Sequence, residues 1–342
     1  MTAFERIRCR QVLGQRRVSR FFTLILAAAA AIPNVAAGDW VGEAIDLMGT
    51  RVSVDLWHED EQRGRELVQS VLAEYRRIDE RMSTYKDDSE LSRVNRDAAA
   101  FPVPVSDELF ELLRRALELS AASEGAFDIT YESVGYLYDF RAAVRPSSAD
   151  IETRLEAIDH EHVRLDSAAR TVAFARPGVR VNLGGIAKGY AVERGATLLR
   201  AAGVQSAMLN AGGDTRVLGD RRGRPWIVAI RHPRTADAVI TRLPLQDEAI
   251  STSGDYERFF EEGGRRYHHI LNPLTGEPTE GVLSVTVIGP DATLTDGLST
   301  AVFVMGARRG LELIDRTQRY EAIVVEASGR LSYSSGLTAP TD

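Results

Sequence analysis

Cysteine is almost absent from this chain of 342 residues. The single cysteine, Cys9, lies in the arginine-rich first twenty residues. If the first 37 residues are removed, the remaining chain has no disulfide, no thiol nucleophile, no cysteine metal site and no cysteine to carry a lipid. The sequence also lacks a Gly-x-x-x-x-Gly-Lys-Ser/Thr loop, a Gly-x-Ser-x-Gly elbow and a His-Glu-x-x-His helix, which excludes the sites those motifs build.

A hydrophobic run long enough to span a membrane is missing as well. The apolar run of residues 21–32 is shorter than the roughly 20 residues that a membrane-spanning helix needs. Six arginines precede it, and Val35-Ala36-Ala37 follows. This layout predicts a secretory signal peptide over residues 1–37, cleaved after Ala37, and a periplasmic protein. An uncleaved anchor is the alternative, and Arg16-Arg17 is a weak indication of twin-arginine export.

Positive charge is scarce after this segment. Residues 38–342 carry 36 basic and 48 acidic side chains, a net charge of −12, once the six arginines and one glutamate of residues 1–37 are set aside. No basic patch interrupts the acidic background. We therefore expect no nucleic-acid partner.

Helical and strand patterns are mixed without regular alternation, which predicts an α+β fold. The length of the chain allows one or two domains. Helices are expected from about residue 67 to 82, after 106, at 187–202 and 296–305, and near 311–316. Residues 83–95 and 141–150 are expected to be loops. Strands are expected at residues 51–57, 163–165, 171–174, 179–182, 207–209, 226–230, 267–271, 283–288, 322–326 and 330–334.

The segment Val181-Asn182-Leu183-Gly184-Gly185-Ile186-Ala187-Lys188 reads as a strand, a glycine pair and a helix with a lysine in its first turn. Two glycines let a ligand approach the backbone, and the free N–H groups of a helix start favour negative charge. Such a segment can hold a phosphate. A tight strand-to-helix turn without a ligand is an equally good explanation.

A second segment, Thr295-Asp296-Gly297-Leu298-Ser299-Thr300, precedes an apolar helical run. Asp296 and Thr300 are four residues apart and therefore share one helix face. A carboxylate and a hydroxyl so placed suit Mg²⁺. The simpler alternative is that Asp296 caps the helix and that Thr300 bonds to its own backbone.

Two further groups could carry chemistry. His268 and His269 are adjacent, so in a strand they point to opposite faces, which argues against a shared zinc ion. Gly125-Ala126-Phe127-Asp128, followed by three aromatic residues, could hold a flat heterocycle, although core packing explains such a cluster more often. Asn210-Ala211-Gly212-Gly213-Asp214 is a tight turn that could bring a second glycine-lined edge near the first.

In their order, these segments resemble one family, the ApbE-type FAD:protein FMN transferases. The resemblance spans about residues 45–335. The matching segments are Met48-Gly49-Thr50, Met82 to Tyr85, Ser89 to Leu91 with Asn95, Gly125 to Asp128, Leu183 to Tyr190, Asn210 to Asp214, Thr252 to Tyr256, His269 to Gly276 and Asp296 to Ala301.

The resemblance implies one catalytic domain over residues 38–342, a two-lobed α+β unit that splits the pyrophosphate of FAD in a Mg²⁺-dependent reaction. FMN would be attached to a threonine or serine hydroxyl of an acceptor flavoprotein, AMP would leave, and membrane association would be at most peripheral, through the acceptor. Carried over by motif, the metal is held by the Gly185 carbonyl, Asp296 and Thr300, and His269 is a candidate for proton transfer, with a buried structural histidine as the alternative. The residues expected to line the FAD site are Met48, Tyr85, Ala126, Phe127, Asp128, Asn182, Lys188 and Leu271, and Lys188 is expected to neutralise the diphosphate during transfer.

Two positions depart from the family pattern, which usually has aspartate where this chain has Asn182 and Glu193. Asparagine keeps the hydrogen-bonding capacity of aspartate and loses its negative charge. Two alternatives to flavin transfer therefore stay open. One is an FAD pyrophosphatase that releases FMN and AMP, and the other is a protein that binds FAD without catalysis.

Overall fold

An eight-stranded sheet forms the larger lobe of the computed structural model, which describes residues 38–235 and 237–337. Every neighbouring pair of its strands is antiparallel. Short turns can join such pairs, as between the first two strands. In spatial order the strands are β1 (Asp39–Leu47), β2 (Thr50–His58), β6 (Ala207–Ala211), β7 (Asp214–Leu218), β10 (Ala249–Gly254), β13 (Val282–Gly289), β14 (Glu321–Glu326) and β15 (Leu331–Tyr333).

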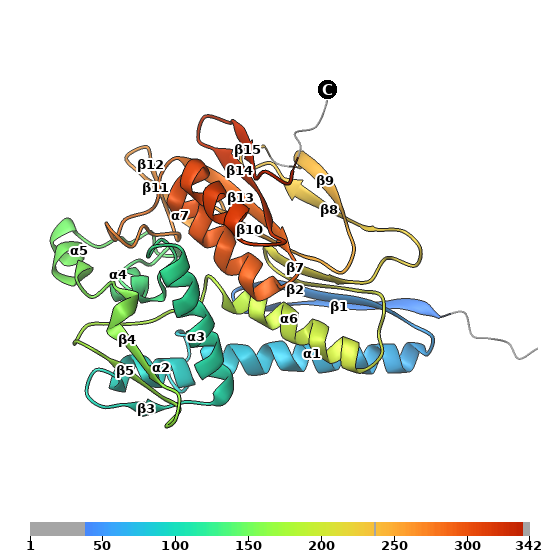
Figure 1. Ribbon diagram of the computed structural model, residues 1–342, viewed down its shortest axis with the longest axis horizontal. Coiled ribbons are helices and arrows are strands. Elements are labelled where there is room, and N and C mark those ends of the chain that lie inside the picture. Colours follow the sequence, from blue (N-terminus) through green and yellow to red (C-terminus); the bar gives the residue numbers. More distant parts are fainter. Residues whose placement is uncertain (1–37, 236, 338–342) are drawn as a thin grey trace, which may run out of the picture. The chain divides into compact units, whose positions relative to one another are not determined.

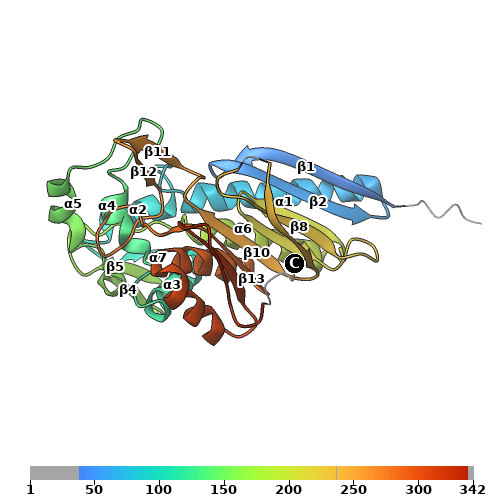
Figure 2. The same ribbon diagram turned by 90° about the horizontal axis from the view of Figure 1, so that it is seen from above.

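Three long helices pack against this sheet: α1 (Glu61–Met82), α6 (Ala187–Ala201) and α7 (Ala292–Arg316). Helix α1 runs along the β1–β2 hairpin (Figures 1 and 2). Its buried stripe recurs at helical spacing, as the sequence predicts. The members of that stripe are Leu67, Val68, Val71, Leu72, Tyr75, Ile78 and Met82.

The smaller lobe lies beside the end of α1 and the start of α6 and carries most of the short elements (Figure 1). Two further hairpins, β8–β9 (Trp226–Arg231, Val239–Leu245) and β11–β12 (Phe259–Glu262, Arg265–His268), extend from the chain. The smaller lobe contains α2 (Glu90–Asp97), α3 (Asp107–Ala122), α4 (Glu132–Gly135), α5 (Ser148–Leu155), the 3-10 turns Ile129–Tyr131 and His160–His162, and a sheet of β3 (Val103–Pro104), β5 (Thr171–Phe174) and β4 (Val163–Asp166). The α+β class and the two lobes are thus as predicted.

Several predicted boundaries are wrong. Residues 179–182 form no strand, because the backbone of Val181 bonds to the Asn95 side chain and the Asn182 N–H donates to the Ile129 carbonyl, 2.9 Å away. The predicted loop of residues 83–95 contains α2, which Ser89 caps, and α5 begins inside the predicted loop of residues 141–150. Strand β12 ends at His268, three residues before the predicted end.

Helix α7 begins four residues earlier than predicted. Asp291 is its N-cap and accepts a hydrogen bond from the Leu294 N–H at 2.9 Å. The predicted break before residues 311–316 is confirmed, because Gly306 has non-helical backbone angles (φ 77°, ψ 168°) and α7 is two helical segments joined at this kink. Because α7 begins at Ala292, Asp296 lies in the second turn of the helix and not at its first residue, where the sequence pattern predicts it.

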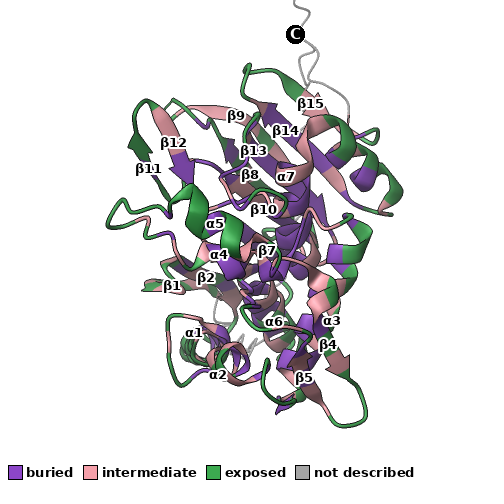
Figure 3. Ribbon diagram, turned by 90° about the vertical axis from the view of Figure 1, so that its left-hand side faces the viewer, coloured by how far each residue is buried: buried purple, intermediate pink, exposed green. Residues whose placement is uncertain are grey.

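The core lies between the main sheet and α6 and α7. Figure 3 shows buried residues concentrated in β10, β13, β14 and α7, whereas α5 is mostly exposed. Among the residues that the structure describes, none of the helices combines the length and apolar composition needed to cross a bilayer. The predicted signal peptide lies outside the described residues.

Candidate active site

The turn before α6 is fixed by one side chain. Asn182 Oδ1 accepts a hydrogen bond from the Gly184 N–H at 2.7 Å. An Asx turn of this kind holds the next two residues without strand pairing. The glycine pair therefore sits between an anchored asparagine and the start of the helix.

Lys188 lies in the first turn of α6 between two carboxylates. Its Nζ is 3.0 Å from Asp214 Oδ2 and 3.4 Å from Asp296 Oδ1, and it also donates to the Gly184 carbonyl at 3.3 Å. Both carboxylate side chains are at most 4 % exposed, whereas that of Lys188 is 20 % exposed. The ammonium therefore connects α6, β7 and α7, and part of it still reaches solvent.

Electrostatics at this triad favour a bound cation. Burial, followed by the negative charge of Asp214, raises the pKa of Asp296, and Lys188 and the Gly189 N–H oppose this rise. Burial alone lowers the pKa of Lys188, but the two carboxylates outweigh it and hold the ammonium charged. Two carboxylates thus share one ammonium, which leaves room for additional positive charge.

Thr300 lies one turn after Asp296 and next to the glycine pair. A Cβ at Gly185 would lie 3.3 Å from Thr300 Oγ1 and 3.2 Å from the ring of Phe127, so only glycine fits here without displacing a neighbour. The Thr300 hydroxyl bonds to Ser253 Oγ at 3.3 Å. Asp296 is therefore not the helix cap, because Asp291 caps α7. Thr300 does not bond to its own backbone, because its hydroxyl bonds to Ser253 on strand β10.

The two histidines have different surroundings. His268 is buried, its Nδ1 accepts from the Ile270 N–H, and its Nε2 lies 2.8 Å from the Thr279 carbonyl. His269 has a buried Nδ1 with no hydrogen-bond partner among the described residues. Burial and the nearby positive charge of Arg258 lower the pKa of His269 to about 3, so its ring is neutral near pH 7.

Sequence comparison identifies the family of proteins to which a chain with this glycine pair, lysine and Asp-x-x-x-Thr helix face is similar. A profile of the ApbE family matches residues 48–324. The chain belongs to the ApbE family.

Relatives and solved structures agree with this assignment. The chain is 34% identical to the FAD:protein FMN transferase of Vibrio cholerae over 77% of its length and 80% of the relative's. It is also 34% identical to the enzyme of that name from Haemophilus influenzae, covering 75% of this chain and 76% of the relative. The ApbE protein of Thermotoga maritima superposes with a TM-score of 0.81 at 32% identity, covering 87% of this chain and 98% of that one. The flavin transferase ApbE of Vibrio cholerae gives a TM-score of 0.77 at 31% identity, with the same coverage.

Some of the flavin-site residues that the ApbE pattern predicts lie near the triad or are open to solvent. Met48 occupies the β1–β2 turn with φ 54°, and that turn leads into Thr50, which lies against Gly212 of the turn that ends at Asp214. The Tyr85 side chain is 85% exposed. Ala126 is partly exposed, and Phe127 lies against Gly185. The turn of residues 210–214 is linked to the glycine pair through Lys188, which lies 3.0 Å from Asp214 and donates to the Gly184 carbonyl.

Two other predicted flavin residues are engaged in the protein itself. Asp128 caps a 3-10 turn, accepting from Thr130 at 2.7 Å and from the His160 N–H at 2.8 Å. Leu271 packs in a small apolar cluster with Val134 and Tyr138. Through these contacts Asp128 holds the 3-10 turn of residues 129–131 next to His160, and Leu271 packs against α4 and the residues that follow it.

Sequence reasoning assigned no role to three residues that surround the site. Asp214 was recognised only as part of a turn, and its carboxylate pairs with Lys188. Arg258 has an exposed side chain with no ion pair to any described residue, and its carbonyl accepts from the His269 N–H at 3.1 Å. Glu132 is buried beside Asn182. Arg258 follows the matching segment Thr252 to Tyr256 by two residues, which places it near the site, whereas no local pattern marks Glu132.

Glu193, the second departure from the family pattern, binds the first N–H of α7, next to the N-cap Asp291. Its Oε2 accepts from the Ala292 N–H at 2.9 Å and lies 3.2 Å from Arg216. A carboxylate at a helix N-terminus is favourable. Glu193 therefore supports the helix that carries Asp296 from outside the triad.

Proposed function

We propose that this protein is an FAD:protein FMN transferase that uses Mg²⁺. The phosphorus atom of the FMN half of FAD would form a bond to a threonine or serine hydroxyl of an acceptor flavoprotein. The bond from that phosphorus to the bridging oxygen would break, and AMP would leave with that oxygen. The observation that carries the proposal is the Asp214–Lys188–Asp296 triad, with Gly185 and Thr300 beside it, in a member of the ApbE family.

The oxygen donors fit a hard divalent cation. Asp296, the Thr300 hydroxyl and the Gly185 carbonyl would hold Mg²⁺, which prefers oxygen ligands and keeps several waters. The described residues contain no cluster of three or more His, Cys, Asp or Glu that could hold a metal, so a site here depends on this mixed set. When bound, the ion supplies charge neutralisation at the diphosphate.

The chain's own residues would bind the diphosphate, orient the flavin and accept a proton from the attacking hydroxyl. Lys188 and Arg258 place positive charge where the diphosphate develops negative charge, and this is the main requirement of phosphoryl transfer. His269 is neutral near pH 7, but its low pKa makes it a weak base in the free protein. The negative charge of a bound diphosphate would offset Arg258 and Lys188 and raise that pKa, which would let a ring nitrogen take the proton of the attacking hydroxyl. Met48, Tyr85, Ala126 and Phe127 would contact the flavin.

The acceptor supplies the nucleophile, which is consistent with a chain that needs no reactive thiol. We further propose export to the periplasm through residues 1–37, so that the acceptor is an exported or membrane-facing flavoprotein. Contact with the membrane would then be peripheral and made through the acceptor.

One experiment tests the reaction. Purified residues 38–342 are incubated with FAD and Mg²⁺, with and without a threonine-containing flavoprotein domain as acceptor, and AMP, free FMN and in-gel flavin fluorescence are followed. Fluorescent acceptor together with AMP is the expected result. Free FMN and AMP alone would identify a pyrophosphatase, and bound FAD without products would identify a non-catalytic flavin-binding protein.

A further inference from the structure

The Asn182 side chain joins three segments that are distant in sequence. Its Oδ1 holds the Gly184 N–H, while its Nδ2 donates to Glu132 Oε2 at 3.0 Å and to Thr84 Oγ1 at 3.3 Å. Thr84 precedes the exposed Tyr85. One amide therefore sets the glycine turn, the start of α4 and the segment that carries Tyr85.

The Glu132 carboxyl group is buried and makes few polar contacts. It is 7 % exposed, and Asn182 is the residue that donates to it. Burial raises the pKa of Glu132 to about 7, while the Asn182 hydrogen bond and the charge of Arg180 oppose the rise. Its Oε1 accepts no hydrogen bond from a described residue. Burying a carboxyl group beside a single protein donor is costly, and Asn182 is that donor.

Glu132 also explains why position 182 is asparagine. An aspartate in the same rotamer would place a carboxylate oxygen about 3 Å from Glu132 Oε2, where two negative charges repel strongly. Asparagine presents a donor to Glu132 and an acceptor to Gly184 at once. The two side chains are therefore chemically matched, with the single carboxyl on α4 and the amide on the glycine turn.

We propose that Glu132 is a positioning residue of the flavin site, which acts through its hydrogen bond with Asn182. Asn182 holds the turn that presents Gly185, and Glu132 fixes the amide. The inference rests on the proposed function for its role, but its contacts are independent of flavin transfer.

The test exchanges the two groups. FAD binding to residues 38–342 is measured by flavin fluorescence at pH 8, without acceptor, for the wild type, N182D, E132Q and the double variant E132Q/N182D, with thermal unfolding in parallel. N182D should weaken FAD binding by about tenfold or more, because two carboxylates then face each other, and E132Q/N182D should recover most of that loss. With an acceptor present, the same recovery should appear in KM for FAD.

N95D is the matched control. Asn95 of α2 donates through Nδ2 to the Val181 carbonyl at 2.9 Å, so the same amide-to-carboxylate change is made at a side chain that anchors the same segment, away from Glu132. N95D should lower the unfolding midpoint, and adding E132Q should not rescue it. The proposal is overturned if N182D binds FAD like the wild type, or if E132Q/N182D binds no better than N182D. If rescue appears in unfolding but not in FAD affinity, the pair is merely structural. Because FAD binding is read without acceptor, the absence of flavin transfer in the wild type would leave this outcome readable.

Discussion

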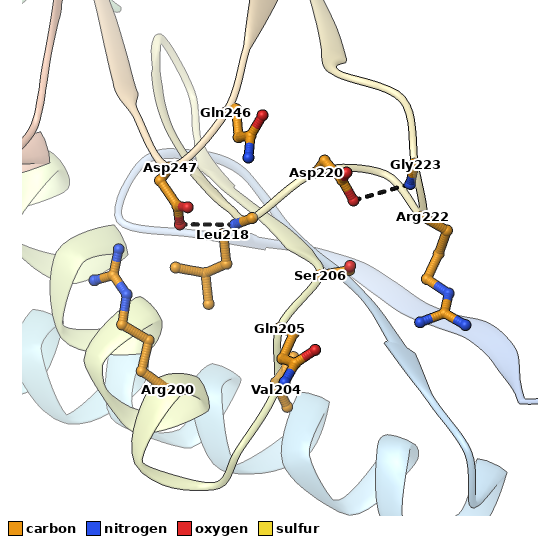
Figure 4. A pocket seen from close by; sticks show the side chains of 11 residues that line it. Arg200, Val204, Gln205, Ser206, Leu218, Asp220, Arg222, Gly223, Gln246 and Asp247 are labelled. Carbon is orange, nitrogen blue, oxygen red and sulfur yellow. Dashed lines mark hydrogen bonds between the residues drawn. The ribbon is translucent and has the colours of Figure 1, made fainter.

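The two ends of helix α6 carry similar charges and use them differently. Lys188 lies at the start of the helix and Arg200 near its end, about 18 Å apart along the axis. Around Arg200, a cavity of about 640 Å³ is lined by polar residues from the ends of β6 and β7 (Figure 4). Around Lys188, the opposite ends of the same strands supply Asp214 and the glycine turn.

At the Arg200 end, each charged group already has a partner. Asp247 accepts from the Gly219 N–H at 2.8 Å, and Asp220 accepts from the Gly223 N–H at 3.0 Å (Figure 4). The Arg222 guanidinium stacks on Trp57, 3.8 Å from the ring centroid. At the Lys188 end, Arg258, His269 Nδ1 and Glu132 Oε1 have no hydrogen-bond or ion-pair partner among the described side chains. The comparison teaches that the chemistry of the lining groups, rather than cavity size, sets the two ends apart: the Lys188 end gathers an ammonium, two buried carboxylates and a histidine nitrogen with no hydrogen-bond partner in the described part of the chain.

Removal of Asp296 should have the largest effect. D296A takes away the one carboxylate expected to hold Mg²⁺ and should lower Mg²⁺-dependent AMP release by on the order of a hundredfold or more. The control is D291A on the same helix, which loses the N-cap and should cost about 1 kcal/mol of stability while activity remains. Wild-type turnover in D296A would show that Asp296 does not hold the metal ion.

Neutralising the two ends of α6 tests the comparison directly. K188M should lower kcat/KM for FAD by about ten- to a hundredfold, because it removes positive charge at the diphosphate and leaves Asp214 facing Asp296. R200M changes an equivalent charge at the other end and should leave kcat/KM within about twofold of the wild type. Equal losses in both variants would show that the two ends do not differ in function.

Stability should depend on pH through Glu132. Its pKa is raised in the folded state to about 7, so the folded protein binds the proton more tightly than the unfolded chain. That contribution is fully present below about pH 4 and is lost as the pH rises through about 7. E132Q should therefore show a smaller fall in unfolding midpoint between pH 5 and 8 than the wild type, measured with Mg²⁺ present so that Asp296 contributes less. An identical fall in both proteins would contradict the burial of this carboxyl.

The smallest effect is expected at the Arg200 end. D247A removes the hydrogen bond to the Gly219 N–H and should cost about 1 kcal/mol, seen as a midpoint lower by a few degrees. Flavin transfer and FAD affinity should stay unchanged. If D247A weakened FAD binding by more free energy than it cost in unfolding, the cavity around Arg200 would contribute to FAD binding, contrary to this comparison.

Local pattern was sufficient for the parts of the fold that repeat along the chain. The buried stripe of α1, the extent of α6 and the α+β class follow from hydrophobic spacing. Strand β1 was missed because its residues are mostly exposed or half-buried and show no alternation, and α2 was missed because its helix is short and polar. Residues 179–182 were predicted as a strand because extended backbone held by side chains has the same apolar pattern as a paired strand.

The sequence by itself determined that Gly185, Lys188, Asp296 and Thr300 belong to one recognisable pattern, because helical spacing and motif order are local properties. Only the tertiary structure decided which carboxylates meet Lys188 and which group meets Asn182. Lys188 and Asp296 are 108 positions apart, and Asn182 and Glu132 are 50 apart. Such contacts follow from the packing of α4, α6, α7 and the sheet, and no periodicity along the chain records them.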